Sequence, residues 1–151
     1  MIWPKFTKIH WKVNKMKIYL ASFFEEHNWG SGMLVSIAKG QKPRVVLVDK
    51  IYEGFCPSEK ISRKYYADKQ DGIESAGEDF QKAYSQELEE YFRQAQFDAT
   101  KESKSLIELL DLKEGETFLS WERSGRSNYR NVLADQLKKI GCEVYLEGVR
   151  I

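Results

Sequence analysis

Hydrophobic and polar residues follow one another along the chain in blocks that predict both strands and helices. Residues 16–24 (MKIYLASFF) form a short apolar run, and residues 44–49 (RVVLVD) form a second one that is rich in β-branched side chains. Runs of this length are typical of buried strands, so we expect the first to be the opening strand and the second a central strand. Residues 33–39 (MLVSIAK) fit a helix and a strand equally well, and their assignment stays open.

The middle of the chain has the three- and four-residue apolar spacing of helices. A turn at residues 56–58 (CPS) is expected to open a short helix that ends at about residue 68. A longer helix is predicted from Ser75 to about residue 96, because Ser75 and Glu78 have the spacing of a capping box and the apolar residues that follow share one face. We interpret that face as part of the core rather than as a stacking surface for a ligand. It carries Phe80, Tyr84, Leu88, Tyr91, Phe92 and Ala95.

The end of the chain predicts a strand, a helix and a second strand. The strand patterns cover residues 116–122 (ETFLSWE) and 142–147 (CEVYLE), the helical pattern between them covers residues 131–141, and residues 106–112 predict a further short helix before this unit. Strand, helix and strand in this order form a βαβ unit with parallel strands and a right-handed crossover. We therefore predict a three-layer, Rossmann-like α/β fold with a mostly parallel sheet of about four to five strands and a C-terminal βαβ unit.

Charge and length support a single α/β domain and set apart only the N-terminal residues. The chain has 151 residues, enough for one domain with a sizeable core, and its 24 basic and 23 acidic residues nearly balance. Residues 1–15 carry four lysines and no acidic residue. We assign residues 1–15 to a basic N-terminal extension and residues 16–151 to a single α/β domain. The extension fits an extra edge strand or a tail better than an arm that binds nucleic acid.

Several classes of protein and site are excluded by composition. No apolar stretch approaches the roughly 18 residues of a membrane span, and no segment has the pattern of a signal peptide, so we expect a soluble, cytoplasmic protein without a membrane partner. Two cysteines and two histidines offer no metal-ligand spacing and no disulfide framework. Neither a metal nor a cofactor is expected, Cys142 is expected to be buried, and Cys56 is expected to be more exposed.

Residues 120–130 (SWERSGRSNYR) are the most informative stretch for function. They place Arg123, Arg126 and Arg130 between a strand and the first turn of a helix. Unpaired backbone N–H groups and the helix dipole favour an anion at such a position. Ser127 or Asn128 is expected to cap the helix.

These residues also have structural interpretations. Glu122 and Arg130 form either an ion pair or contacts with a ligand, and neither alternative is favoured. Arg123 and Arg126 fit solvated loop charges better than a phosphate clamp. Trp121 fits the core, or else the floor of a pocket for a base or sugar.

The same stretch resembles a known family. Residues 122–134 (ERSGRSNYRNVLA) resemble the C-terminal signature of the bacterial domain-of-unknown-function 488 family, and residues 17–23 (KIYLASF) fit the first strand of that family. The family has a cysteine where this chain has Ser120, and Cys-His-Arg where residues 128–130 are Asn-Tyr-Arg. The resemblance implies a divergent member without a thiol nucleophile or a histidine base at these positions, which favours binding over turnover.

The sequence thus predicts non-catalytic binding of a small anionic, nucleotide-like ligand. One alternative is a phosphoester or nucleotide-processing enzyme, with Glu122 or Asp49 as the general base. A second is a nucleic-acid-binding accessory protein that uses the basic extension together with the arginine loop. The departures from the family pattern also fit a protein of a mobile element. The predicted ligand-binding residues are Trp121, Glu122, Arg123, Arg126, Asn128 and Arg130.

Overall fold

Six short strands form a mostly parallel sheet in the computed structural model, which describes residues 15–38, 48–122 and 129–151. The order across the sheet is β3-β2-β4-β1-β5-β6, and of these pairings only that of β5 with β6 is antiparallel. The strands are β1 (Lys17–Ser22), β2 (Leu34–Ser36), β3 (Lys50–Ile51), β4 (Thr117–Ser120), β5 (Glu143–Leu146) and β6 (Val149–Arg150).

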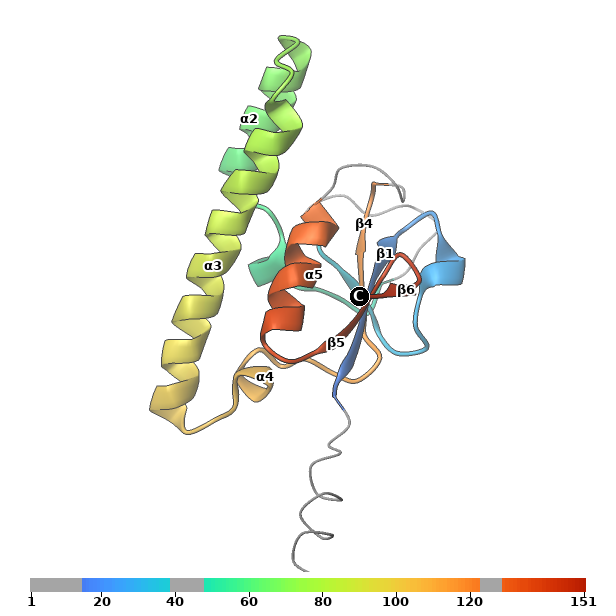
Figure 1. Cartoon of the computed structure of the whole chain (residues 1–151), viewed down its shortest axis with the longest axis vertical. Coiled ribbons are helices and arrows are strands. Elements are labelled where there is room, and N and C mark those ends of the chain that lie inside the picture. The colour runs from blue at the N-terminus through green and yellow to red at the C-terminus, as the bar shows by residue number, and fades with distance from the viewer. Residues whose placement is uncertain (1–14, 39–47, 123–128) are drawn as a thin grey trace, which may run out of the picture.

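The α-helices of the described residues gather beside this sheet. Helix α5 contacts β1 and β5, and α3 contacts α5. Figure 1 shows α2 and α3 as a hairpin that stands beside α5 and reaches beyond the sheet. The fold is therefore mixed α/β, compatible with the three-layer, Rossmann-like arrangement that the sequence predicted. The helices are α2 (Glu59–Gln70), α3 (Ala76–Glu102), α4 (Leu106–Leu109) and α5 (Tyr129–Lys139), with short 3₁₀ helices η1 (Glu26–Asn28) and η2 (Glu53–Phe55).

Most predicted elements are confirmed, with shifted ends. The first strand is β1, the stretch at 33–39 that was left open contains β2, and the predicted βαβ unit is β4, α5 and β5. Strands β4 and β5 are both parallel to β1, which lies between them. The described sheet has six strands rather than four or five, because the chain turns back after β5 to add the two residues of β6. Residues 44–47 of the predicted central strand lie outside the described residues, and its last two residues, Val48 and Asp49, are not in a strand. The strand that follows them, β3, lies at the edge of the described sheet rather than at its centre.

The long helix α3 differs from its prediction at both ends. It extends to Glu102 rather than to about residue 96, because its buried face continues through Ala99. The predicted capping box is wrong: the Ser75 hydroxyl donates to the Asp79 carboxylate at 2.9 Å, and the Ser75 side chain makes no cap hydrogen bond. A capping box does form at the start of α4, between Ser105 and Glu108.

Apolar side chains fill both sides of the sheet, as the alternation along its strands requires. Ile18 and Leu20 of β1 pack with Leu133 of α5 in the larger core, whereas Ala21 and Leu119 belong to a smaller cluster. Cys142 is buried and Cys56 is half-buried, as predicted. Burial raises the pKa of the Cys142 thiol to about 11. None of the helices in the described part of the chain combines the length and apolar character needed to cross a membrane.

Candidate functional site

A cleft of about 490 Å³ opens between the α2–α3 hairpin and the residues that follow β2 and β4. These residues mark the carboxyl ends of parallel strands, where ligands of α/β sheets usually bind. The volume also falls in the range of about 300–1,000 Å³ that is typical of small-molecule sites. The lining residues are Ala38, Pro57, Glu59, Ser62, Tyr65, Tyr66, Lys69, Gly77, Phe80, Gln81, Trp121, Glu122 and Tyr129.

One wall of the cleft consists of aromatic side chains from three helices. The ring of Tyr65 on α2 lies 5.1 Å from that of Phe80 on α3, which in turn lies 6.0 Å from the ring of Tyr129 on α5. The Tyr129 hydroxyl donates to the carbonyl of Ile37 at 3.1 Å and so ties the start of α5 to the end of β2. Burial raises the pKa of Tyr129, which keeps the phenol neutral. The second α2 tyrosine, Tyr66, is 56% exposed.

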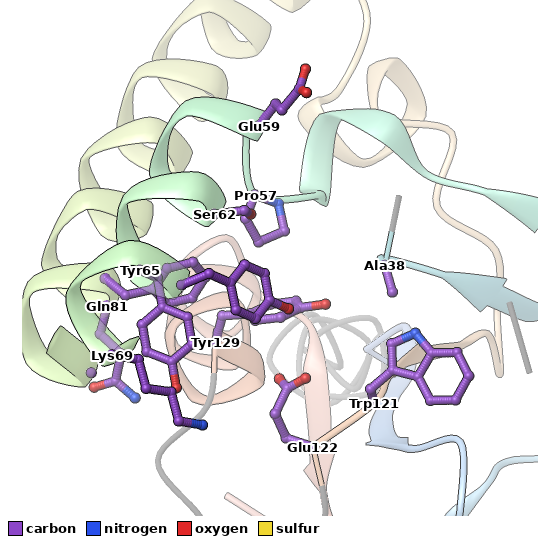
Figure 2. A pocket seen from close by; sticks show the side chains of 13 residues that line it. Ala38, Pro57, Glu59, Ser62, Tyr65, Lys69, Gln81, Trp121, Glu122 and Tyr129 are labelled. Atoms are coloured by element: carbon purple, nitrogen blue, oxygen red, sulfur yellow. The ribbon is translucent and has the colours of Figure 1, made fainter. Parts of the chain in front are cut away.

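The opposite side of the cleft carries Trp121. The Trp121 ring packs 5.1 Å from Phe23 and 5.5 Å from Phe24, the two residues that follow β1. Figure 2 shows Trp121 and Ala38 on the side of the cleft away from Tyr65. Aromatic rings therefore border the space on two sides, which suits a flat ligand.

The side chain of Glu122 lies between these two walls, with its carboxyl group directed into the space between them (Figure 2). Burial raises the pKa of Glu122, against hydrogen bonds from the backbone and from Ser120 and the positive charge of Arg130, which lower it. The Oε1 atom of Glu122 is buried and has no hydrogen-bond partner among the described residues. The cleft thus contains a carboxyl oxygen with free acceptor capacity.

Arg130 is completely buried at the edge of this site. Its Nη1 donates to the Ser120 hydroxyl and to the backbone carbonyl of Glu122, both at 2.6 Å. Its Nη2 donates to Glu147 Oε1 at 3.0 Å and forms an ion pair with that carboxylate. Arg130 therefore joins the end of β4 to the turn between β5 and β6.

A tight turn positions the acidic partner of Arg130. Glu147 and Gly148 both have positive φ angles, 52° and 83°, and form the two-residue connection between β5 and β6. Such turns match the twist of a hairpin, and glycine adopts the second position without strain. The backbone N–H of Glu147 donates to the Leu20 carbonyl at 2.9 Å, which fixes the turn against β1.

The structure separates the predicted ligand-binding residues into three groups. Trp121 and Glu122 line the cleft, and Arg130 lies buried beside it. The ion-pair partner of Arg130 is Glu147, while Glu122 contacts the guanidinium through its backbone carbonyl. Contact of these residues with a ligand stays a prediction. Arg123, Arg126 and Asn128, together with the alternative cap Ser127, lie outside the described residues.

The other sequence alternatives depend on residues away from the cleft. Asp49, the second candidate base, accepts a hydrogen bond from the Leu34 backbone at 2.7 Å and is not part of the cleft lining. The nucleic-acid alternative requires the basic extension, of which residues 1–14 lie outside the described residues. Among the described residues, no cluster of three or more histidine, cysteine or acidic side chains has a geometry that fits a metal ion.

The helical wall of the cleft was not predicted from the sequence. Phe80 was assigned to the core, and Tyr65 and Tyr66 were assigned no role. The local sequence carries no signal for this wall, since only the structure shows that α2 contributes aromatic and apolar side chains but no fully buried residue. A helix of this kind presents its apolar face to a partly open space, here the cleft.

The described lining is close to neutral, in contrast to the arginine-rich loop of the sequence. Glu59 and Glu122 supply carboxyl groups, and Lys69, whose Nζ lies 5.7 Å from the Tyr65 ring centre, supplies a positive charge. Arg123 and Arg126 occur in the sequence between Glu122 and Tyr129, two residues that line the cleft.

Comparison with known proteins adds no relative. No protein-family model matches the chain, and no curated protein or solved structure matches it.

Proposed function

We propose that the chain binds a small, anionic, nucleotide-like molecule in this cleft and does not transform it. The observation that carries the proposal is a cleft at the carboxyl ends of parallel strands, bordered by aromatic rings on two sides and holding a buried carboxyl group between them. Aromatic walls recognise the flat face of a base, and a buried polar group fixes its orientation.

The two ends of such a ligand have different partners in this proposal. The base lies between Trp121 and the helical wall, next to Glu122. The phosphate is contacted by Lys69, which lines the cleft. Arg126, which the sequence also suggests for this role, lies outside the described residues.

An enzyme that processes nucleotides is the second candidate. The raised pKa of Glu122 favours it, because a carboxyl group with that property in a cleft suits general acid–base chemistry. Binding ranks first because the described lining contains neither a histidine nor a cysteine that acts as a partner to Glu122.

Calorimetric titration with each of the four common nucleoside monophosphates, and with inorganic phosphate, tests the proposal. We expect at least one nucleotide to bind more tightly than phosphate alone. Tyr66→Ala should weaken that binding about fivefold or more, since base stacking on an aromatic side chain contributes about 1–3 kcal/mol. Phe97→Ala is the matched control, because Phe97 is 64% exposed on a helix and does not line the cleft.

Three results would decide against the proposal or its ranking. Binding of phosphate but of no nucleotide, or of nothing at all, would overturn it. Equal losses in Tyr66→Ala and Phe97→Ala would place the ligand outside the cleft. Mass spectrometry of the nucleotide after incubation with the protein separates the two candidates, because an unchanged nucleotide supports binding and a hydrolysed one supports the enzyme.

A further inference from the structure

We infer that the cleft selects a guanine-type ring, whose two adjacent N–H donors bind the carboxylate of Glu122. The inference rests on the proposed function and specifies which base of the nucleotide-like ligand the cleft prefers. It starts from Glu122 Oε1, which is buried in the cleft without a hydrogen-bond partner among the described residues. A buried acceptor in this state is costly unless a ligand supplies the missing donor.

Two buried phenols whose pKa values the charge of Glu122 affects donate to other acceptors. The hydroxyl of Tyr129 donates to the Ile37 carbonyl at 3.1 Å, and that of Tyr84 donates to the Phe55 carbonyl at 2.6 Å. Burial is the main cause that raises the pKa of both phenols, and the charge of Glu122 adds to it.

The charged groups and the thiol near Glu122 are also engaged. Arg130 binds the Ser120 hydroxyl, the Glu122 carbonyl and the Glu147 carboxylate. The thiol of Cys56 donates to the Tyr52 carbonyl at 3.3 Å. Hydrogen bonds from Ser120 and the backbone to the Glu122 carboxyl are present and lower its pKa, but burial still dominates and raises it. The Glu122 carboxyl group thus keeps acceptor capacity at Oε1, and Figure 2 shows this group directed toward the space between Tyr129 and Trp121.

The chemistry of the bases then selects among nucleotides. An ionised carboxylate only accepts hydrogen bonds, and its two oxygens accept from a pair of adjacent donors. Guanine carries adjacent N1–H and 2-amino donors on one edge. Adenine, cytosine and uracil place an acceptor beside each donor on the corresponding edge, so one carboxylate oxygen would face a lone pair.

Calorimetry with guanosine, inosine and adenosine monophosphate on the whole chain tests the inference. Inosine monophosphate retains the N1–H donor and lacks the 2-amino group. We expect the guanine nucleotide to bind about tenfold to a hundredfold more tightly than the adenine nucleotide, as for the loss of a hydrogen bond to a charged group, with the inosine nucleotide between them. This ranking is measured on the wild type and needs no variant.

Two variants locate the preference at one side chain. Glu122→Gln replaces one acceptor oxygen by a donor amide, and should reduce the preference for guanine over adenine at least tenfold. Glu59→Gln is the matched control, because Glu59 also lines the cleft but its side chain is 73% exposed and pairs with Arg63. Glu59→Gln should keep the wild-type ranking. Thermal melting confirms that both variants are folded.

The outcomes for the inference and for the proposed function are separate. Tight binding of a nucleotide without a guanine preference, or a preference that survives Glu122→Gln, overturns the inference and leaves the proposed function in place. Binding of none of the three nucleotides overturns both.

Discussion

Two glutamates at opposite ends of β4 occupy contrasting environments. Glu116 directly precedes the strand, is fully buried, and lies 3.0 Å from Lys50 Nζ while it accepts a hydrogen bond of 2.7 Å from the Lys113 backbone. Glu122 follows the strand and lines the cleft. Each residue has one buried carboxylate oxygen without a hydrogen bond among the described residues, but that oxygen of Glu116 forms the ion pair with Lys50, whereas no such ion pair is found for Glu122 Oε1 in the described part of the chain. Each residue lies within two residues of the same strand, but only Glu116 has a lysine ammonium group paired with its carboxylate among the described residues.

The comparison indicates that the Glu116 carboxylate has a structural role and the Glu122 carboxyl group a functional one. A buried charge with an ion-pair partner and hydrogen bonds is part of the packed structure, and removing one partner is costly. A carboxyl group in a cleft whose pKa burial raises, despite the hydrogen bonds and the nearby positive charge that lower it, indicates a functional site. Arg130 forms an ion pair with Glu147, and although its positive charge lowers the pKa of Glu122, burial of Glu122 has the larger effect and raises it.

The largest effect is expected for Arg130→Met. The change removes the guanidinium that joins the end of β4 to the β5–β6 turn, and leaves Ser120 and Glu147 without this donor. We expect a loss of about 3 kcal/mol in the free energy of unfolding, as for breaking a buried ion pair, measured by urea denaturation. Arg93→Met is the control, since the side chains of Arg93 and its ion-pair partner Glu90 are 71% and 70% exposed, and it should cost less than about 1 kcal/mol. Similar losses in both variants would contradict a structural role for Arg130.

Glu116→Gln should have the next largest effect. The amide keeps the shape of the side chain but removes the charge that pairs with Lys50, which is itself only 29% exposed. We expect a loss of about 1–3 kcal/mol in the same urea experiment, the usual cost of leaving a buried group unsatisfied. A variant as stable as the wild type would show that the two ends of β4 do not differ as described.

Glu122→Gln should have the smallest effect, with the opposite sign. Burial raises the pKa of Glu122, so the folded protein disfavours the ionised form relative to the unfolded chain. This group therefore contributes stability at a pH below its unfolded pKa, and the contribution is lost as the pH rises through the folded pKa. At neutral pH the glutamine variant should be slightly more stable than the wild type, and the two should converge as the pH falls. Urea denaturation at neutral and at acidic pH measures this trend, and a variant that is clearly less stable at neutral pH would contradict it.

Much of the fold follows from local patterns that the sequence displays. The apolar run of β1, the periodic face of α3 and the order of β4, α5 and β5 were enough to predict an α/β fold with a mostly parallel sheet. The details that failed depend on tertiary contacts. Ser75 bonds to Asp79 instead of capping α3, and the two-residue β6 exists because the turn at Glu147 and Gly148 returns the chain to β5.

The site was predictable only in part, because its residues come from distant segments. Trp121 and Glu122 were identified from their position at the carboxyl end of a predicted strand, which is a local property. The pairing of Arg130 with Glu147 joins residues 17 positions apart. The tyrosines of α2 reach the cleft only because the hairpin of α2 and α3 packs beside the strand ends. Neither of these arrangements has a signature in the local sequence.

Mapping the guanosine monophosphate site by NMR chemical-shift changes tests the central claim, that the carboxyl end of β4 binds the ligand and its amino end does not. The account predicts large changes for the indole N–H of Trp121 and for the backbone amides of Tyr65 and Phe80, which line the cleft. It predicts little change for the amides of Lys50 and Glu116 at the other end. Changes centred on Lys50 and Glu116, or the absence of change at Trp121 when the nucleotide is in excess, would contradict it.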